Sequence, residues 1–159
     1  MSDEALREHL VRILDWEEAH VGFDKAIADL APDKRGARAP GFEHSVWQLL
    51  EHMRVAQEDI LDFCVNPKYV HTMKWPDDYW PTPGQPTDEQ WNTSVATIHR
   101  DTESLAKFTV ETDIDLTSKI PRGTGQTYLR TVLVAMDHNS YHVGQIIAVR
   151  RLIGAWTAS

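Results

Sequence analysis

Apolar residues recur every three or four positions along four stretches of this chain, a pattern that predicts four amphipathic helices. We expect the first to run as a single helix from about Asp3 to Leu30. Its apolar stripe consists of Leu6, Leu10, Ile13, Trp16, His20, Phe23, Ile27 and Leu30. The segment "APDKRGARAPG" follows, and its Pro and Gly residues predict a break.

The second and third predicted helices share a start signal. Ser45 is followed three residues later by Gln48, and Thr87 by Gln90, which is the capping-box arrangement. The second helix should end near Asn66-Pro67, because the residue before a proline is biased away from helix. The inner stripes are Val46, Leu49, Met53, Ala56, Ile60 and Phe63 in one helix, and Trp91, Val95, Ile98, Thr102, Leu105 and Phe108 in the other.

The fourth predicted helix runs from about Gly125 to Leu152, after an irregular connector at residues 111–123. Gly154 is a typical C-terminal stop, and Arg150 and Arg151 suit the negative end of the helix dipole. Four such helices in a chain of 159 residues predict an all-α fold, a four-helix bundle, as a single domain over residues 1–159.

One connector is unusually long. Residues 67–86, "PKYVHTMKWPDDYWPTPGQP", contain five of the eight prolines together with four aromatic residues. A segment of this length permits a crossover between helices two and three. Loops of this kind are often functional, although a packed cap over one end of the bundle explains the composition equally well.

Composition narrows the function classes. A net charge of −8 argues against nucleic acid or an anionic membrane as the main partner. Cys64 is the only cysteine, which excludes an intrachain disulfide and a Cys-rich zinc site. The start "MSDEALREH" lacks the apolar core of a secretory signal, and no apolar run reaches the roughly 18 residues of a membrane span, so we expect a cytoplasmic protein.

The candidate chemistry lies in the histidines. The stretch "DHNSYHVGQI", residues 137–146, places His138 and His142 one helical turn apart in a helix that is apolar nearly all round. Buried imidazoles need partners. His52, at the edge of the second helix's stripe, is either a third metal ligand or a structural histidine bonded to a carbonyl or to Asp59. We expect His20 at the core edge, and the others facing solvent: His9, His44, His71 and His99, with His71 near the site only if its loop folds over.

"SVWQLLEHM" (45–53) and "DHNSYHVGQI" (137–146), continuing into "RRLIGAW" (150–156), resemble the two signature segments of the DinB-like (DinB/YfiT-type) superfamily of metal-binding four-helix bundles. The resemblance covers most of the chain, including the Pro- and aromatic-rich crossover between helices two and three. It implies that His52, His138 and His142 bind one divalent metal ion.

Three neutral imidazoles suit Zn(II) or Ni(II), and three protein ligands leave coordination positions open. An ion there can ionise a bound thiol or lower the pKa of bound water. Members of the superfamily include S-transferases and isomerases that use bacillithiol, mycothiol or glutathione. The resemblance therefore implies a metal-dependent transferase that activates a low-molecular-weight thiol for attack on a small electrophile, in a stress or detoxification role.

Further residues receive roles in this hypothesis. Trp75, Tyr79 and Trp80 are candidates for the substrate entrance. Gln145 is placed to orient a metal-bound water or thiol, and the carboxylates Glu51, Asp59 and Asp137 to accept imidazole N–H groups. We expect a small-molecule substrate and a homodimer.

Two alternatives stay open. A metal-dependent hydrolase would use a metal-bound water, but the chain lacks HExxH, and Glu51 points about 100° away from His52 on the helix. A non-catalytic metal- or ligand-binding stress protein is the other.

Overall fold

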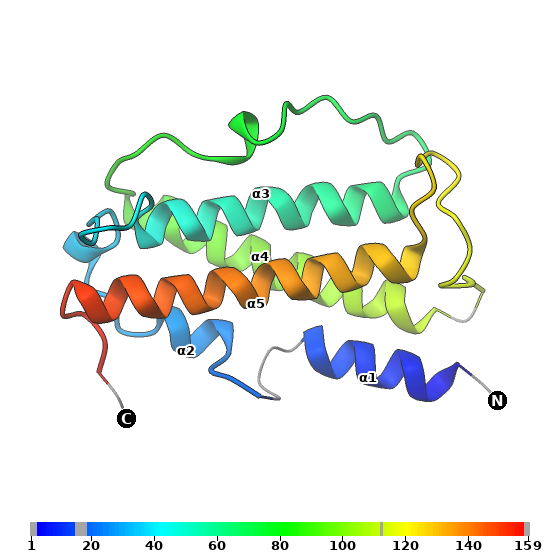
Figure 1. Cartoon of the computed structure of the whole chain (residues 1–159), viewed down its shortest axis with the longest axis horizontal. Helices are drawn as coiled ribbons and strands as arrows, with labels where there is room; N and C mark the ends of the chain where they lie inside the picture. The colour runs from blue at the N-terminus through cyan, green and yellow to red at the C-terminus, as the bar shows by residue number, and fades with distance from the viewer. Residues whose placement is uncertain (1–2, 15–18, 112, 158–159) are drawn as a thin grey trace.

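The computed structural model describes residues 3–14, 19–111 and 113–157, which form an all-helical bundle. These residues contain five α-helices and no strand (Figure 1). The helices are α1 (Glu4–Leu14), α2 (Phe23–Ile27), α3 (Val46–Val65), α4 (Asp88–Val110) and α5 (Tyr128–Leu152), with 3-10 turns η1 (Pro32–Lys34) and η2 (Asp77–Tyr79). None of the described helices is long and apolar enough to cross a lipid bilayer.

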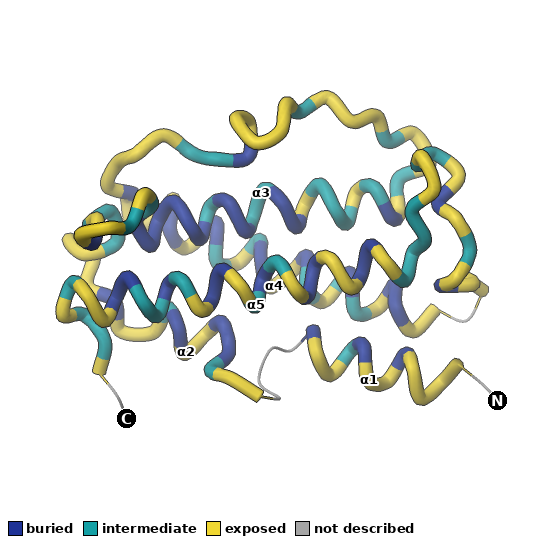
Figure 2. The backbone as a smooth tube through the Cα atoms, viewed as in Figure 1, coloured by how far each residue is buried: buried dark blue, intermediate teal, exposed yellow. Residues whose placement is uncertain are grey.

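The three long helices make the frame of the bundle. Helices α3 and α4 run in the same direction, and α5 runs back against α3 (Figure 1). Because α3 and α4 are parallel, the chain must return along the bundle between them, and residues 67–86 do so outside α3. The predicted all-α bundle with a long crossover is confirmed. Figure 2 shows that most of this crossover is exposed, while buried positions recur along α3 and α5.

The predicted caps of α3 and α4 are confirmed. Ser45 and Thr87 are the N-caps, and both capping boxes are complete. Helix α3 ends at Val65, next to the expected Asn66. Helix α5 begins at Tyr128, later than predicted, because residues 119–127 form a turn in which the Ile120 N–H donates to the carbonyl of Gln126 at 2.8 Å.

The prediction of one helix from Asp3 to Leu30 is wrong. Helix α1 ends at Leu14, residues 19–22 are not helical, and α2 begins after Gly22, which is extended (φ −73°, ψ 173°). The two short helices lie end to end and together take the place of the fourth long helix (Figure 1). His20 is exposed rather than at the core edge. Trp16 lies outside the described residues.

A tertiary contact explains why the apolar pattern of α1 does not match its buried face. Leu6 and Ile13 are exposed, whereas Arg7 is buried. The Arg7 guanidinium donates to the carbonyls of Thr109 and Glu111, each at 2.8 Å, at the C-terminal end of α4. The last carbonyls of a helix lack partners within the helix, so a cation there satisfies them. This polar contact sets which face of α1 is buried, and a pattern of apolar residues cannot predict it.

The core of the bundle is split into two apolar clusters with polar side chains between them. One includes Leu49, Met53, Ile98, Val143 and Ile146, and the other Leu10, Cys64, Leu105, Val132 and Met136. Between them, the Asn139 side-chain amide donates to Gln57 Oε1 at 2.5 Å, and Gln57 donates to the carbonyl of Ile98 at 2.9 Å. These buried amides are hydrogen-bonded, as buried polar groups must be. They join α5, α3 and α4 beside the candidate site.

Candidate metal centre

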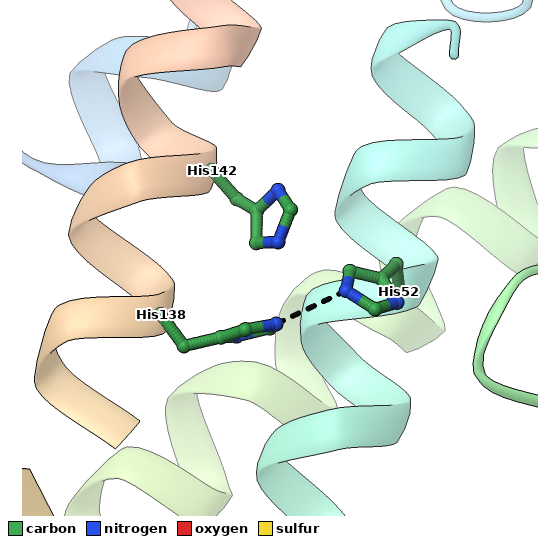
Figure 3. A group of neighbouring side chains, drawn as sticks. All are labelled: His52, His138 and His142. Carbon is green, nitrogen blue, oxygen red and sulfur yellow. Dashed lines mark hydrogen bonds between the residues drawn. The ribbon is translucent and has the colours of Figure 1, made fainter. Parts of the chain in front are cut away.

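Three histidines from two helices meet beside the buried amides. His138 and His142 on α5 point toward His52 on α3 (Figure 3). One ring nitrogen from each lies within 4.8 Å of the others, and the Nε2 atoms of His138 and His52 are 3.0 Å apart. His52 and His142 are buried and His138 is half-buried. The structure thus brings together the three residues that the sequence selected as candidate ligands.

The backbone accounts for this convergence. His138 and His142 are four residues apart, just over one turn, so their rings lie on one face of α5. The centroids of the two rings are 4.4 Å apart. Helix α3 packs against that face in the opposite direction, which brings His52 opposite the pair.

The ring of His52 is held from outside its own helix. Its Nδ1–H donates to the backbone carbonyl of Tyr79 at 2.9 Å. Because a carbonyl can only accept, Nε2 is left unprotonated and faces the other two histidines. The indole of Trp80 stacks on the imidazole with ring centroids 3.8 Å apart and planes 3° from parallel. The ring of His44 stacks on the other face of Trp80, with ring centroids 3.7 Å apart and an angle of 11° between the planes.

The two α5 histidines are oriented by neighbours on α5. His142 Nδ1–H donates to Oε1 of Gln145 at 2.7 Å, which leaves its Nε2 free to bind a metal. His138 Nδ1 lies 3.4 Å from Oδ1 of Asn139, at the outer limit of a hydrogen bond.

The electrostatic environment keeps these imidazoles neutral. Burial lowers the pKa of His52 to about 4. Burial, reinforced by the nearby His138 and His52, lowers the pKa of His142 to about 3. Burial also lowers the pKa of His138 below its ordinary value. Neutral imidazole is the form that binds metals, so all three side chains are ready to bind at neutral pH.

One pair of donor nitrogens has the spacing that a divalent metal ion requires, and the third donor lies within 4.8 Å of both. With metal–nitrogen bonds of about 2.0–2.1 Å, two ligand nitrogens lie roughly 3–3.4 Å apart, and the Nε2 atoms of His52 and His138 match this at 3.0 Å. Three nitrogen donors without a thiolate or carboxylate form a borderline site of the kind that Zn(II) and Ni(II) occupy. The cluster could therefore hold a metal ion.

The other polar candidates contact the protein as follows. The amide oxygen of Gln145 accepts from His142, and its amide nitrogen donates to the hydroxyl of Tyr141. Glu51 pairs with Arg54 at 2.6 Å and accepts from Ser94 at 2.6 Å. Asp59 accepts from two tyrosine hydroxyls, and Nδ1 of His71, which is not part of the cluster, lies 4.0 Å from its carboxylate. Asp137 is exposed, and its charge acts on His138 from a distance.

The three aromatic candidates differ in how closely they approach the histidine cluster. Trp80 lies directly against His52, and its ring centroid is 6.0 Å from that of His142, with the two planes nearly perpendicular. Tyr79 is buried and touches the cluster through its carbonyl. Trp75 remains 64% exposed and packs on Tyr79 instead.

The prediction of a solvent-facing His44 is wrong, because His44 is half-buried in its stack on Trp80. Sequence reasoning also missed Gln57 and Asn139. For His44 no periodic signal exists, since it precedes the cap of α3 and its partner lies in the crossover. The amide pair did carry a signal, because an amide on an apolar helix face needs a buried partner.

A cavity of about 560 Å³ lies between α3, α5 and the start of the crossover, and its lining does not include the three histidines. Its wall begins at Val134, one turn before His138, and continues over the start of the crossover at Tyr69 and His71. Two cations, Arg122 and Arg130, face a single carboxylate, Asp59. This volume falls in the range of small-molecule sites.

Comparison with known proteins supports the fold. No curated protein and no solved structure matches this chain. The sequence model of the DinB superfamily matches residues 15–146, which include both signature segments and all three histidines. The chain belongs to the DinB superfamily.

Proposed function

We propose that this protein is a metal-dependent transferase that activates a low-molecular-weight thiol for attack on a small electrophile. The observation that carries the proposal is the convergence of three neutral imidazoles from α3 and α5, two of them buried and that of His138 half-buried. Three protein ligands leave room for an external ligand, as in catalytic rather than structural sites. A divalent ion held there would supply the positive charge that favours a thiolate at neutral pH.

The nucleophile has to come from outside the chain. The only thiol, Cys64, is 2% exposed, and burial raises its pKa to about 12. It lies twelve residues beyond His52 on α3, roughly 18 Å along the helix. A free small thiol that enters from solvent avoids both obstacles.

The cavity next to Asp59, which reaches Val134 one turn before His138, supports a small substrate with a negative group. Asp59 already accepts two tyrosine hydroxyls, and Arg122 already donates to the carbonyls of Phe63 and Cys64. The exposed Arg130 therefore has the cation best placed to meet an incoming carboxylate. In a chain of net charge −8, a local pair of arginines favours an anionic ligand at this position.

Thiol conjugation tests the proposal directly. Metal-loaded protein is mixed with glutathione, bacillithiol or mycothiol and a chlorodinitrobenzene electrophile. The sulfur–carbon bond forms as chloride leaves, and product absorbance reports the rate. We expect turnover that disappears with a chelator and returns with Zn(II) or Ni(II). Metal-dependent cleavage of an ester without thiol would favour the hydrolase, and tight ligand binding without turnover would favour a binding protein.

A charge variant tests the cavity as the place of the thiol. Arg130→Gln should raise KM for a carboxylate-bearing thiol about fivefold, because a partly exposed charge contact contributes up to about 1 kcal/mol. The same variant should leave KM for neutral mercaptoethanol unchanged. Lys107→Gln, which removes an exposed cation on α4, is the matched control. Equal effects on both thiols would remove the cavity from the proposal.

The homodimer is also part of the proposal. Leu133 and Tyr141 expose apolar surface on α5, at 47% and 63%. Light scattering that shows only monomer would remove the dimer and leave the proposed chemistry intact.

A further inference from the structure

The crossover is fastened to α3 at three points that surround His52. Nε2 of Gln48 donates to the carbonyl of Pro81 at 3.2 Å. Nδ1 of His52 donates to the carbonyl of Tyr79 at 2.9 Å. The hydroxyl of Tyr79 donates to Oδ2 of Asp59 at 2.6 Å. Positions 48, 52 and 59 are four and seven residues apart, so they lie on one face of α3.

Tyr69 and Trp80 reinforce this fastening. Tyr69, earlier in the crossover, donates to the other oxygen of Asp59 at 2.8 Å. Trp80 is clamped flat between the rings of His52 and His44. A carboxylate that accepts two hydroxyl groups makes charge-assisted bonds, which are stronger than neutral ones. The segment is therefore held by polar bonds at its ends and by stacking in its middle.

We propose that residues 79–81 of the crossover position the imidazole of His52 for metal binding, and that Asp59 holds them in place. The carbonyl of Tyr79 fixes which nitrogen carries the proton, and Trp80 fixes the plane of the ring. The inference rests on metal binding by the three histidines but does not depend on the reaction. It gives Asp59 a positioning role through Tyr79, one link further from the imidazole than sequence reasoning placed it.

The proposal also assigns the crossover a mechanical role. A lid would have to release Tyr79 and Trp80 in order to open, and each release would free the ring of His52. Residues 79–81 are therefore a fixed strap. Any opening motion belongs to the exposed part of the crossover around Val70 and Trp75, which are 73% and 64% exposed.

Two tyrosine variants test the strap with a built-in control. Tyr79→Phe and Tyr69→Phe each remove one hydroxyl from Asp59, but only residue 79 also touches His52. Chelator competition gives the Kd for Zn(II) or Ni(II), and Co(II) absorption reports the coordination geometry. We expect Tyr79→Phe to raise the metal Kd about tenfold and shift the Co(II) bands, since outer partners of metal-binding histidines contribute about 10–100-fold in affinity. Tyr69→Phe should change the Kd less than about threefold. Equal effects from the two variants would overturn the proposal.

Two substitutions at Trp80 test the stack. Trp80→Leu removes the flat surface and should raise the metal Kd about tenfold or more, while Trp80→Phe should restore most of the affinity. Circular dichroism and urea unfolding check that each variant is folded. Wild-type affinity in a folded Trp80→Leu variant would overturn the proposal. A wild-type chain that binds no divalent ion would overturn both this and the proposed function, whereas wild-type binding without thiol transfer would overturn the proposed function alone.

Discussion

The two sides of the histidine cluster are oriented in different ways. On α5, the ring of His142 is fixed by Gln145, three residues further along the same helix. On α3, the ring of His52 is fixed by Tyr79 and Trp80, 27 and 28 residues further along the chain. The α5 side is thus arranged as soon as the helix forms, because neighbours at this spacing share a face. The α3 side is complete only when the crossover has folded against it.

This difference separates metal affinity from chain stability. A contact within one helix can be lost with little effect on the fold. A contact that fastens a long connector serves both the ligand and the fold, because ordering the connector costs conformational entropy that its contacts must offset. Variants of the two sides should therefore be distinguishable by measuring metal affinity and unfolding together.

The largest effect is expected from the ligands themselves. His138→Ala or His142→Ala should abolish stoichiometric metal, since two remaining imidazoles make a much weaker site. Helicity should remain largely intact, because the cores on either side are independent of the rings. Elemental analysis and circular dichroism measure the two outcomes. One ion per chain retained in either variant would contradict the assignment.

The next effect is expected from the long-range side. Asp59→Ala should raise the metal Kd about tenfold or more. It should also lower the free energy of unfolding by about 2 kcal/mol, because two tyrosine hydroxyls lose a charged acceptor. Chelator competition and urea unfolding report the pair of values. A loss of affinity at unchanged stability would mean that Asp59 does not fasten the crossover.

The local side should respond more weakly and in affinity alone. Gln145→Ala should raise the metal Kd about tenfold or less, because His142 keeps its helical position and loses only one partner. The free energy of unfolding should change by less than about 0.5 kcal/mol, as expected for a partly exposed side chain. The same two measurements apply. A destabilisation as large as that of Asp59→Ala would erase the distinction between the two sides.

The same division explains what the sequence could predict. The caps at Ser45 and Thr87 are local patterns, and both were predictable. The meeting of His52 with the α5 pair follows from helical phase and antiparallel packing, with the family resemblance selecting which histidines matter. The caps depend on neighbours within one turn, and the meeting of the histidines, 86 residues apart in the chain, depends on regular helix packing.

Features that depend on distant partners were not predictable. Arg7 faces inward only because the carbonyls at the end of α4 lie there. Asp59 was expected to accept from an imidazole, but its carboxylate accepts from the hydroxyls of Tyr69 and Tyr79 instead. Where a proline-rich crossover settles on a helix is decided by tertiary contacts, and neither hydrophobic period nor motif spacing encodes them.

The smallest effect is expected at Cys64, which belongs to neither side of the cluster. Cys64→Ala should leave the metal Kd unchanged.

In the native protein, iodoacetamide should alkylate Cys64 very slowly even at pH 9, since the reactive thiolate forms only near its raised pKa of about 12. In urea the thiol regains its ordinary pKa and should react readily, which mass spectrometry can follow. Cys64 packs in the apolar cluster away from His52, so its reaction reports opening of that end of the bundle. Bound metal could slow the alkylation by more than its effect on global unfolding explains. In that case the two ends of α3 would be coupled, and metal at His52 would stabilise the helix beyond the residues that contact the cluster.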